Sequence, residues 1–414
     1  MKAVVLAAGK GERLWPLTET RPKPLLPIGN RPILERTLDV LVAAGIRKVI
    51  LVVNYMEKAI RDRIGSGAAI GSDIEYVRQK RPSGTADAVG SAETNVEGND
   101  SFLVIYGDDY FDKGSVREFV DKAGRKNGIT IGTCKVKDAS PFGRLEVRNG
   151  RVLDIEEKMA KPGPGLVNTG LYMMNRSLFS TIRKTTRSKR GEFELTDSLK
   201  ALIRKGEPVH SEELGDSGWV GISYPWDLLE ANEQILKKQQ TNLNGEIEQG
   251  VLIKGGAVIE KGAVLKAGCR LEGPVHIGQN CQVGPNAYLR SYTCLGDDAR
   301  VGAASEIKNS IVMAGTKIPH LSYIGDSVLG EYCSLGAGTI TANLRFDEAA
   351  IKSRVKGALV SSGRKKLGAV MGDEVRTGIN VSIFPGVKVG HGAWLGPSAI
   401  VEKDVASGAR IKAA

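Results

Sequence analysis

The first half of the chain alternates short apolar runs with segments of helical periodicity. Residues 2–8 (KAVVLAA) are an apolar run that ends in small residues, which is typical of a buried parallel strand. Residues 32–45 (PILERTLDVLVAAG) carry apolar side chains at helical spacing and stop at a glycine. Residues 48–54 and 102–109 (KVILVVN and FLVIYGDD) are the next predicted strands. This order predicts an α/β, Rossmann-like domain built on a mixed, mostly parallel sheet.

The second half repeats every six residues. Aliphatic residues recur at this spacing without a break at Ile253, Ile259, Leu265, Leu271, Ile277, Val283, Leu289, Leu295, Val301 and Ile307. The spacing returns at Met371, Thr377, Ile383, Val389, Leu395 and Val401. Such hexapeptide repeats predict a parallel β-helix, in which three short strands make one coil and each apolar residue points inward. We expect the polar stretch between the blocks, residues 342–366, to be a loop that leaves the helix.

The six-residue register shifts near residue 320. Counting on from Ile307 gives Met313 as the next inward residue, and then Ile318, Ile324, Leu329 and Leu335 at steps of five, six, five and six. His320 lies in this region, within TKIPHLSYIGDS, and we interpret the shift as a device that positions it. The other three histidines, His210, His276 and His391, are predicted to be exposed turn residues.

A helical pattern over residues 225–240, followed by the breaking sequence TNLNG, separates the two halves. We therefore predict an α/β domain over 1–225, a linker helix over 226–245 and a β-helix over 246–414.

Composition narrows the class of protein. The net charge is +11, with basic runs at 181–190 and 364–366, which are read either as solvated surface or as attraction for phosphorylated substrates. No basic stripe is interleaved with aromatic residues along the chain, so we expect no nucleic-acid partner. The five cysteines include no CxxC pair, which disfavours disulfides and zinc. No apolar stretch approaches 18 residues, so we expect no membrane span and a cytoplasmic location.

Candidate chemistry begins directly after the first predicted strand. Residues 7–28 (AAGKGERLWPLTETRPKPLLPI) open with a glycine-rich turn, which lets backbone N–H groups approach phosphates. It is neither a Walker P-loop nor a GxGxxG motif. Arg13 and Lys23, held on proline-framed backbone, are two cations that suit a polyphosphate.

This stretch resembles the signature of sugar-1-phosphate nucleotidylyltransferases, and RPSGTADAV, YGDD, PFGRLEV, IEEK, LVNTGLY and YPWDLLEAN resemble further segments of that family in chain order. The resemblance implies catalytic roles for Arg13 and Lys23 and Mg²⁺ ligation by Asp108 and Asp227. It implies nucleotide binding by Leu6, Ala8, Gly9, Gln79, Gly84 and Thr85, and sugar binding by Gly143, Glu157 (or its neighbour Glu156) and Asn168. The chain departs from the thymidylyl branch at Gly221, where that branch often has an aspartate.

The implied reaction needs no side-chain nucleophile. An oxygen of the sugar 1-phosphate attacks the α-phosphorus of UTP or dTTP, and pyrophosphate leaves. Catalysis is then positioning and charge neutralisation, which two cations and a magnesium ion supply.

The strings IPHLSYIGD and LGAGTITANL resemble the acetyltransferase half of bifunctional N-acetylglucosamine-1-phosphate uridylyltransferases, and KLGAVMGDEVRTGIN resembles the archaeal branch. The resemblance implies a left-handed, trimeric β-helix, as a trimer or a dimer of trimers. It implies that His320 is the general base, a task that suits a side chain whose ordinary pKa is near 6.5. It also implies amino-sugar-phosphate binding by Arg290, Lys308, Tyr323 and Ser334, which replaces the family's asparagine, and acetyl-CoA binding by Asn343 and Ala337.

Three functions remain open at this point. The first is a bifunctional enzyme that acetylates glucosamine 1-phosphate with acetyl-CoA and joins the product to UTP. The second is a glucose-1-phosphate thymidylyl- or uridylyltransferase whose β-helix only trimerises the protein. The third is a non-catalytic regulatory subunit, which Arg13, Lys23 and Asp108 disfavour.

Overall fold

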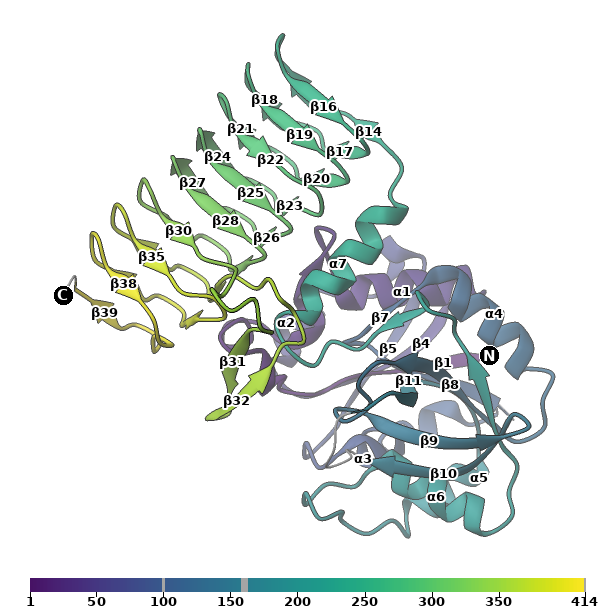
Figure 1. Ribbon diagram of the computed structural model, residues 1–414. Helices are drawn as coiled ribbons and strands as arrows, with labels where there is room; N and C mark the ends of the chain where they lie inside the picture. The colour runs from purple at the N-terminus through teal and green to yellow at the C-terminus, as the bar shows by residue number, and fades with distance from the viewer. Residues whose placement is uncertain (99–100, 158–162, 413–414) are drawn as a thin grey trace. The chain divides into compact units, whose positions relative to one another are not determined.

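The computed structural model describes residues 1–98, 101–157 and 163–412, and it divides into two compact units. The first unit consists of Met1–Lys10 and Pro32–Gly221, and the second of Gly11–Arg31 and Ile222–Ala414. The chain is traced in Figure 1. The segment Gly11–Arg31 therefore belongs to the unit that contains the repeats, although the sequence places it inside the first predicted domain.

The first unit is built on a nine-stranded sheet, counted over the described residues. From edge to edge its strands are β5 (Asp73–Arg78), β4 (Lys48–Val53), β1 (Lys2–Ala7), β6 (Ser101–Tyr106), β11 (Gly165–Asn175), β8 (Ile129–Val136), β12 (Val209–Glu213), β10 (Arg151–Glu157) and β9 (Gly143–Arg148). The sheet is mixed, as predicted, but it is not mostly parallel. The pairs β5–β4, β4–β1, β1–β6 and β8–β12 are parallel, and the other neighbouring pairs are antiparallel. The difference comes from β11, which runs antiparallel to both of its neighbours, and from β9 and β10, whose short connection allows only an antiparallel hairpin.

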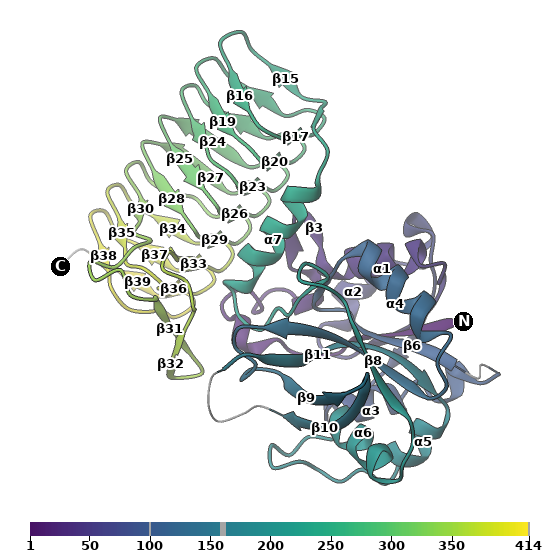
Figure 2. The same ribbon diagram turned by 45° about the vertical axis from the view of Figure 1, so that its right-hand side comes forward.

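Helices cover both faces of this sheet. The helices are α1 (Ile33–Ala43), α2 (Glu57–Ile64), α3 (Thr85–Gly90), α4 (Lys113–Ala123), α5 (Ser177–Ile182) and α6 (Leu195–Arg204). Helix α1 packs beside α4, whereas α3, α5 and α6 pack together on the opposite face, as Figure 2 shows. Asp112 caps α4 by accepting from the N–H groups of Gly114 and Ser115 at 3.0 and 3.2 Å. A small antiparallel pair, β7 (Tyr110–Phe111) with β13 (Trp219–Val220), completes the unit.

The second unit contains three stacks of short parallel strands, and the chain visits the stacks in rotation. Stack 1 consists of β14 (Asn242–Leu243), β17 (Ala257–Ile259), β20 (Val275–Ile277), β23 (Cys294–Leu295), β26 (Ile311–Val312), β29 (Val328–Leu329), β33 (Val370–Met371) and β36 (Lys388–Val389). Stack 2 consists of β15 (Glu246–Ile247), β18 (Val264–Leu265), β21 (Gln282–Val283), β24 (Arg300–Ala303), β27 (Lys317–His320), β34 (Arg376–Thr377), β37 (Trp394–Leu395) and β39 (Arg410–Ile411), and Ser334 bridges β27 to β34. Stack 3 consists of β16 (Leu252–Lys254), β19 (Arg270–Glu272), β22 (Tyr288–Leu289), β25 (Glu306–Lys308), β28 (Tyr323–Gly325), β30 (Ile340–Thr341), β35 (Ser382–Ile383) and β38 (Ile400–Val401). This arrangement is consistent with the predicted β-helix; its handedness stays a prediction.

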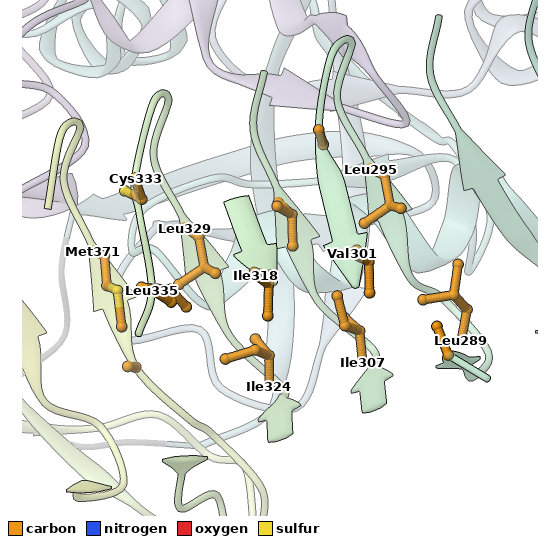
Figure 3. Close-up of a cluster of buried hydrophobic side chains, with 14 of the residues drawn as sticks. Leu289, Leu295, Val301, Ile307, Ile318, Ile324, Leu329, Cys333, Leu335 and Met371 are labelled. Atoms are coloured by element: carbon orange, nitrogen blue, oxygen red, sulfur yellow. The ribbon is translucent and has the colours of Figure 1, made fainter. Parts of the chain in front are cut away.

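The inward side chains of the stacks form one continuous apolar core. Most of the positions predicted from the six-residue spacing belong to this core, from Ile259 to Val401. Figure 3 shows the middle of the core, where Leu289, Val301 and Ile324 point into the space between the strands. Each coil buries its own small cluster against its neighbours, so stability grows coil by coil.

One of the two shortened steps of the register lies elsewhere than predicted, and the other, from Ile324 to Leu329, is confirmed. Val312 pairs with Leu295 and Leu329 and is fully buried in the core, so Val312 rather than Met313 points inward. The shortened steps are therefore Ile307 to Val312 and Ile324 to Leu329, both at corners between stacks 3 and 1. His320 lies on a corner of ordinary length between stacks 2 and 3. The interpretation that the shift positions His320 is wrong.

Two other expectations are corrected. His276 is not an exposed turn residue: it lies in β20, buried, with its ring bonded to Glu260 and Gln239. His210 lies in β12 and is half-buried. The insertion over 342–366 is not only loop, because β31 (Lys352–Val355) and β32 (Ala358–Ser361) form an antiparallel hairpin in it.

Helix α7 (Asp227–Lys238) also belongs to the second unit and lies in the range predicted for the linker helix. The segment Gly11–Arg31 adds two short 3₁₀ turns, Glu12–Leu14 and Lys23–Leu25, and the short strand β2 (Pro27–Ile28), which is followed by β3 (Arg31–Pro32). None of the helices formed by the described residues is long and apolar enough to cross a membrane.

Candidate active sites

The glycine-rich loop starts from a buried strand end. Leu6 and Ala8 are buried at the end of β1, which anchors the loop on the sheet. Gly9 is exposed, and a Cβ placed on it would meet no atom within 4 Å. The backbone at Gly9 therefore faces open space, as a contact to a nucleotide phosphate requires.

The predicted base-binding residues lie together. The Gln79 amide donates to the Gly84 carbonyl at 3.1 Å and to the Asp87 carboxylate at 2.7 Å. Gly84 has a φ of 120°, and a Cβ there would lie 2.4 Å from the carbonyl oxygen of Phe193, so only glycine fits. Thr85 begins α3, and its hydroxyl accepts from the backbone N–H of Leu195 at 3.0 Å. The segment is therefore held in one conformation before any nucleotide binds.

Asp108 lies in the turn after β6, at the carboxyl end of the strand, which is the edge where open α/β sheets bind ligands. Gly107 before it is packed tightly, because a Cβ there would lie 2.7 Å from the Val5 side chain. Within the described parts of the chain, no three His, Cys, Asp or Glu side chains are grouped to hold a metal. Mg²⁺ at nucleotide sites usually takes one or two carboxylates and completes its coordination with substrate phosphates and water.

The predicted sugar-binding residues also converge. Gly143 pairs with Glu157 across the β9–β10 hairpin, and a Cβ on Gly143 would lie 2.8 Å from the Glu157 carboxylate. The Asn168 amide donates to the phenol oxygen of Tyr172 at 2.5 Å. Burial raises the pKa of Tyr172, and the charge of Glu157 raises it further. Glu156 is exposed, so the geometry favours Glu157 of the two neighbours.

Sequence reasoning missed residues that border this group. Burial raises the pKa of Tyr106, and its hydrogen bond to Tyr172 adds to the shift. Arg190 pairs with the buried Glu194 at 2.5 Å, and burial raises the pKa of that carboxyl, with Glu157 adding to the effect. The signal for Arg190 was the basic run 181–190, of which it is the last residue.

Within the second unit, Arg13, Lys23 and Asp227 lie close to one another. The Arg13 guanidinium lies 5.6 Å from the centre of the Tyr224 ring. The Asp227 carboxylate, at the start of α7, accepts from the N–H groups of Ser223 and Tyr224 at 2.8 and 2.7 Å. Burial raises the pKa of Asp227 to about 7, although the hydrogen bonds from these N–H groups and the charge of Lys23 lower it. A carboxylate that burial destabilises in this way gains from a bound cation.

Gly11 and Gly221 carry constraints that the sequence did not reveal. Gly11 has a φ of 64°, and a Cβ on it would lie 2.8 Å from the Cβ of Lys23, so glycine lets the Lys23 backbone approach the loop. A Cβ on Gly221 would lie 2.6 Å from the Trp219 ring and 2.7 Å from Phe142. Gly221 therefore cannot be exchanged for the aspartate of the thymidylyl branch without moving two aromatic rings.

The segment that carries Arg13 and Lys23 is fastened to the repeat coils. Arg21 is largely buried, and its guanidinium pairs with Glu331 at 2.5 Å and with Asp373. Asn30 donates to Asp297 at 2.9 Å. Breaking a buried ion pair on one side typically costs about 3–5 kcal/mol, so this network fixes the course of the segment.

In the repeats, the Asp326 side chain is bonded to three other side chains. Two of them belong to predicted site residues, and the third belongs to a residue next to one of these. The Asp326 carboxylate is almost fully buried and accepts from Lys308 at 3.1 Å, from the Asn309 amide at 2.7 Å and from the Asn343 amide at 2.6 Å. Asn343 also donates to the Tyr323 phenol oxygen at 3.1 Å. Lys308, Tyr323 and Asn343 are thus joined by a carboxylate that sequence reasoning passed over, although it ends the quoted string IPHLSYIGD.

Gly325, the residue before Asp326, packs against the same cluster. A Cβ on Gly325 would lie 2.6 Å both from the Asn343 amide nitrogen and from the Tyr323 phenol oxygen. The two shortened corners follow Lys308 and Gly325, so both adjoin this cluster. The register shift therefore shapes the backbone that carries it. Burial raises the pKa of the Tyr323 phenol.

Of the remaining predicted residues, Arg290 and His320 lie at opposite edges of stack 3. Arg290 lies at the same edge as Lys308 and pairs with Glu306 at 2.9 Å, and Glu306 stands beside Tyr323 in register. His320 is exposed at the opposite edge, and its carbonyl accepts from Gly338, the neighbour of Ala337, at 3.3 Å. Ser334 is not brought to this cluster. It faces outward on stack 2, between Lys317 and Arg376.

Replacing Asp326 by asparagine tests the cluster. The change keeps the shape but removes the charge that holds Lys308 and Asn343, so we expect acetyl transfer to fall about 10- to 100-fold. Nucleotidyl transfer should stay at the wild-type rate. The exposed aspartate Asp62, which pairs with Lys58 on α2, provides the matched control, since Asp62→Asn should change neither rate. Unchanged acetyl transfer in Asp326→Asn would contradict the positioning role.

Comparison with known proteins gives the family. The family profile described as nucleotidyl transferase matches residues 2–238, and that described as the GMPPB C-terminal domain matches residues 271–383. The chain is 43% identical to a protein named bifunctional protein GlmU from Methanocaldococcus jannaschii, over 98% of this chain and 96% of that protein. It is 42% identical to a bifunctional sugar-1-phosphate nucleotidylyltransferase/acetyltransferase from Sulfurisphaera tokodaii, over 99% of both chains.

A solved structure and a further relative match less of the chain. The crystal structure of a putative glucose-1-phosphate thymidylyltransferase from Bacillus anthracis, in complex with a sucrose, is 30% identical with a TM-score of 0.52 and covers 58% of this chain and 97% of that one. Glucose-1-phosphate thymidylyltransferase from Streptomyces antibioticus is 34% identical over 80% of this chain and 92% of that protein. Since the relatives that match nearly end to end are named as bifunctional proteins, one of them with both activities in its name, this chain belongs to the family of bifunctional sugar-1-phosphate nucleotidylyltransferase/acetyltransferases.

Proposed function

We propose that the protein makes a nucleotide sugar in two steps, acetylating glucosamine 1-phosphate with acetyl-CoA and then transferring UMP from UTP to the N-acetylglucosamine 1-phosphate. The observation that carries the proposal is the cluster of Lys308, Tyr323, Asn343 and Asp326, which is formed by the coil that bears His320 and the coils before and after it. If the repeats only assembled the protein into a trimer, a buried carboxylate bonded to a lysine and an amide would have no role there.

In nucleotidyl transfer the chain supplies positioning and charge. Leu6, Ala8, Gly9, Gln79, Gly84 and Thr85 would hold the nucleotide, and Gly143, Glu157 and Asn168 the sugar. Arg13 and Lys23 would stabilise the pyrophosphate that leaves. Asp108 and Asp227 would hold Mg²⁺, and the raised pKa of Asp227 fits a carboxylate that a cation stabilises. When bound, the ion would neutralise the charge of the reacting phosphates.

In acetyl transfer the amine of the sugar must first lose a proton. His320 would accept that proton, the nitrogen would attack the thioester carbonyl, and the CoA thiol would leave. Arg290 and Lys308 would bind the sugar phosphate, with Tyr323 and Ser334 adding contacts, and Asn343 and Ala337 would contact acetyl-CoA. The pairing of Arg290 with Glu306 is partly exposed and therefore weak enough to yield to a phosphate.

A second function has a specific observation in its favour. The relative from Streptomyces antibioticus, named for glucose-1-phosphate thymidylyl transfer alone, covers 80% of this chain, including part of the repeats. Under this alternative the chain would transfer dTMP or UMP to glucose 1-phosphate, and the repeats would only assemble the protein.

One panel separates the two. Each of UTP and dTTP is combined with glucose 1-phosphate, N-acetylglucosamine 1-phosphate, glucosamine 1-phosphate and galactosamine 1-phosphate, with and without acetyl-CoA. Release of CoA thiol with an amino-sugar 1-phosphate, together with pyrophosphate release from UTP, would support the bifunctional enzyme. Pyrophosphate release without CoA release under any condition would support the alternative.

The repeats are also proposed to form a left-handed β-helix that assembles as a trimer or a dimer of trimers. Exposed apolar side chains lie on stack 3 and its corners in the last coils, namely Leu321, Ile340, Ile379 and Ile400. Apolar surface of this kind commonly marks a protein interface. We expect light scattering to give a trimeric mass or a multiple of it, and Ile400→Glu to weaken the assembly at constant β-sheet signal. A monomeric wild type would refute the trimer.

A further inference from the structure

The segment Gly11–Arg31 is bonded to the last coils of the repeats along one corner, where the chain passes from stack 1 to stack 2. Four residues of this corner, each on the next coil, bond to the segment, namely Glu331, Asp373, His391 and Ser407. Arg21 pairs with the first two, and Glu19 accepts from the backbone N–H of the third at 3.3 Å and from the hydroxyl of the fourth at 2.7 Å. The course of the segment therefore depends on coils that lie more than 300 residues later in the chain.

Asp373 is the central residue of this contact. Its Oδ1 atom accepts from the backbone N–H of Glu331 at 2.8 Å, which joins two neighbouring coils, and its Oδ2 atom accepts from Arg21 and from the Thr20 hydroxyl. The side chains of Arg21 and Asp373 are only 12% and 9% exposed. Although burial lowers it, the pKa of Arg21 is raised by the charges of Asp373 and Glu331. A guanidinium held by two carboxylates in this way keeps one geometry.

The charges of Glu331 and Asp373 are committed to Arg21. Among the ion pairs of the described residues, those of the two carboxylates involve Arg21 and no other cation. A buried ion pair is rarely more stabilising than packed apolar side chains of the same volume. What the two carboxylates provide is therefore a fixed place for Arg21 rather than stability of the coils.

A single proline separates Arg21 from the proposed catalytic cation Lys23. The ring of Pro22 fixes its φ, which is −72°, and Lys23 begins the 3₁₀ turn directly after it. Lys23 is itself buried, at 8% exposure. Because the backbone between the two residues has little rotational freedom, a displacement of Arg21 is passed on to Lys23.

We propose that Glu331 and Asp373 are positioning residues of nucleotidyl transfer, which set the position of Lys23 through Arg21. The inference rests on the proposed role of Lys23 in that reaction, and it makes the rate of the first activity depend on two carboxylates of the repeats. Lys23 would stabilise the pyrophosphate as it leaves. Its displacement should therefore lower kcat and leave the KM for the sugar phosphate nearly unchanged.

The kinetic test changes the contact from both sides. R21Q and the double variant E331Q/D373N should each lower kcat for pyrophosphate release from UTP and N-acetylglucosamine 1-phosphate about tenfold, with the KM for the sugar phosphate within about twofold of wild type. R21K should recover most of the rate, because lysine keeps a cation that can pair with one of the carboxylates. The control R204Q removes an exposed arginine from the end of α6 and should behave as wild type.

A double-mutant comparison shows whether Arg21 acts through Lys23. In a K23M background, R21Q should cause no further loss, since the group that it positions is already absent. Losses that multiply would overturn the inference. A low rate in K23M with a wild-type rate in R21Q would overturn this inference alone, whereas a wild-type rate in K23M would refute the proposed role of Lys23 and the inference with it.

Hydrogen exchange tests the contact without turnover, and so without regard to which nucleotide or sugar phosphate the protein uses. Backbone amides of residues 14–26 should exchange about tenfold faster in R21Q and in E331Q/D373N than in wild type or R204Q. Amides of β17 and β20, in coils distant from Glu331 along the stack, should keep the wild-type rate. Unchanged exchange over residues 14–26 would overturn the inference. Faster exchange in β17 and β20 as well would also overturn it, because the variants would then have loosened the whole repeat domain.

Discussion

Asp108→Asn should lower nucleotidyl transfer about 100- to 1,000-fold while acetyl transfer continues at the wild-type rate. The reason is electrostatic: at the end of β6 the carboxylate is proposed to hold the ion that offsets the charge of the reacting phosphates. Asparagine keeps the size and can still accept a hydrogen bond, but it lacks the charge that fixes a divalent cation. Pyrophosphate release measured at increasing Mg²⁺ should show a weaker apparent affinity for the ion as well as a lower maximal rate.

The matched control is Asp121→Asn, an aspartate exposed on α4. It removes the same charge from the same unit and should leave both activities unchanged. If Asp108→Asn reached the wild-type rate at saturating Mg²⁺, Asp108 would have no part in the transfer step. If both activities fell together in Asp108→Asn, the change would have damaged the fold rather than the site.

The sequence predicted the architecture because its signals are periodic. In the repeats every sixth residue is apolar, and a core shared only between neighbouring coils leaves no other arrangement for those side chains. In the first unit the apolar runs of β1, β4 and β6 and the helical spacing of α1 were sufficient, since these strands are buried on both faces and the helix buries one. The antiparallel half of the sheet was less visible because β9 and β10 mix buried with exposed side chains instead of forming an apolar run.

The error in the register has a local cause. Ile311, Val312 and Met313 are three consecutive apolar residues, so a spacing of six selects Met313 as readily as a spacing of five selects Val312. The pairing of Val312 with Leu295 and Leu329 shows that Val312 is the inward residue. This pairing cannot be recognised from the neighbouring residues in the sequence. Because the first shortened step lies one strand earlier than predicted, the shortened corners are those that carry Lys308 and Asp326, and not the corner that carries His320.

The residues missed in the candidate sites depend on distant partners. Asp326 reads as an ordinary turn aspartate until Lys308 and Asn343 are placed on either side of it by the coils before and after. Arg21 reads as part of the phosphate-binding signature, yet its partners Glu331 and Asp373 lie more than 300 residues later in the chain. Family resemblance supplied the residues that are proposed to contact substrate, whereas the residues that hold them follow only from the packing.

The strongest test of the second activity is His320→Ala, which should lower acetyl transfer about 10²–10⁴-fold. An amine bound as its ammonium form cannot attack a thioester, so a proton acceptor must stand beside it. His320 is exposed on the corner between stacks 2 and 3, beside Tyr323 in sequence and on the same strand as the cation Lys317. Release of CoA thiol from acetyl-CoA with glucosamine 1-phosphate measures the effect, and pyrophosphate release measures the other activity, which should not change.

His210→Ala provides the matched control, because it removes an imidazole that is bonded to the Asn127 carbonyl in the first unit. Both activities should survive it. A second variant, His320→Asn, keeps a polar side chain on the corner, and it should lose as much acetyl transfer as His320→Ala if proton transfer is the role. Should His320→Asn retain most of the rate, the imidazole would be a binding contact rather than a base. Should both variants acetylate normally, His320 would be a surface residue of the repeats, and the base would have to be sought among the groups joined to Asp326, the carboxylate that the shortened corners enclose.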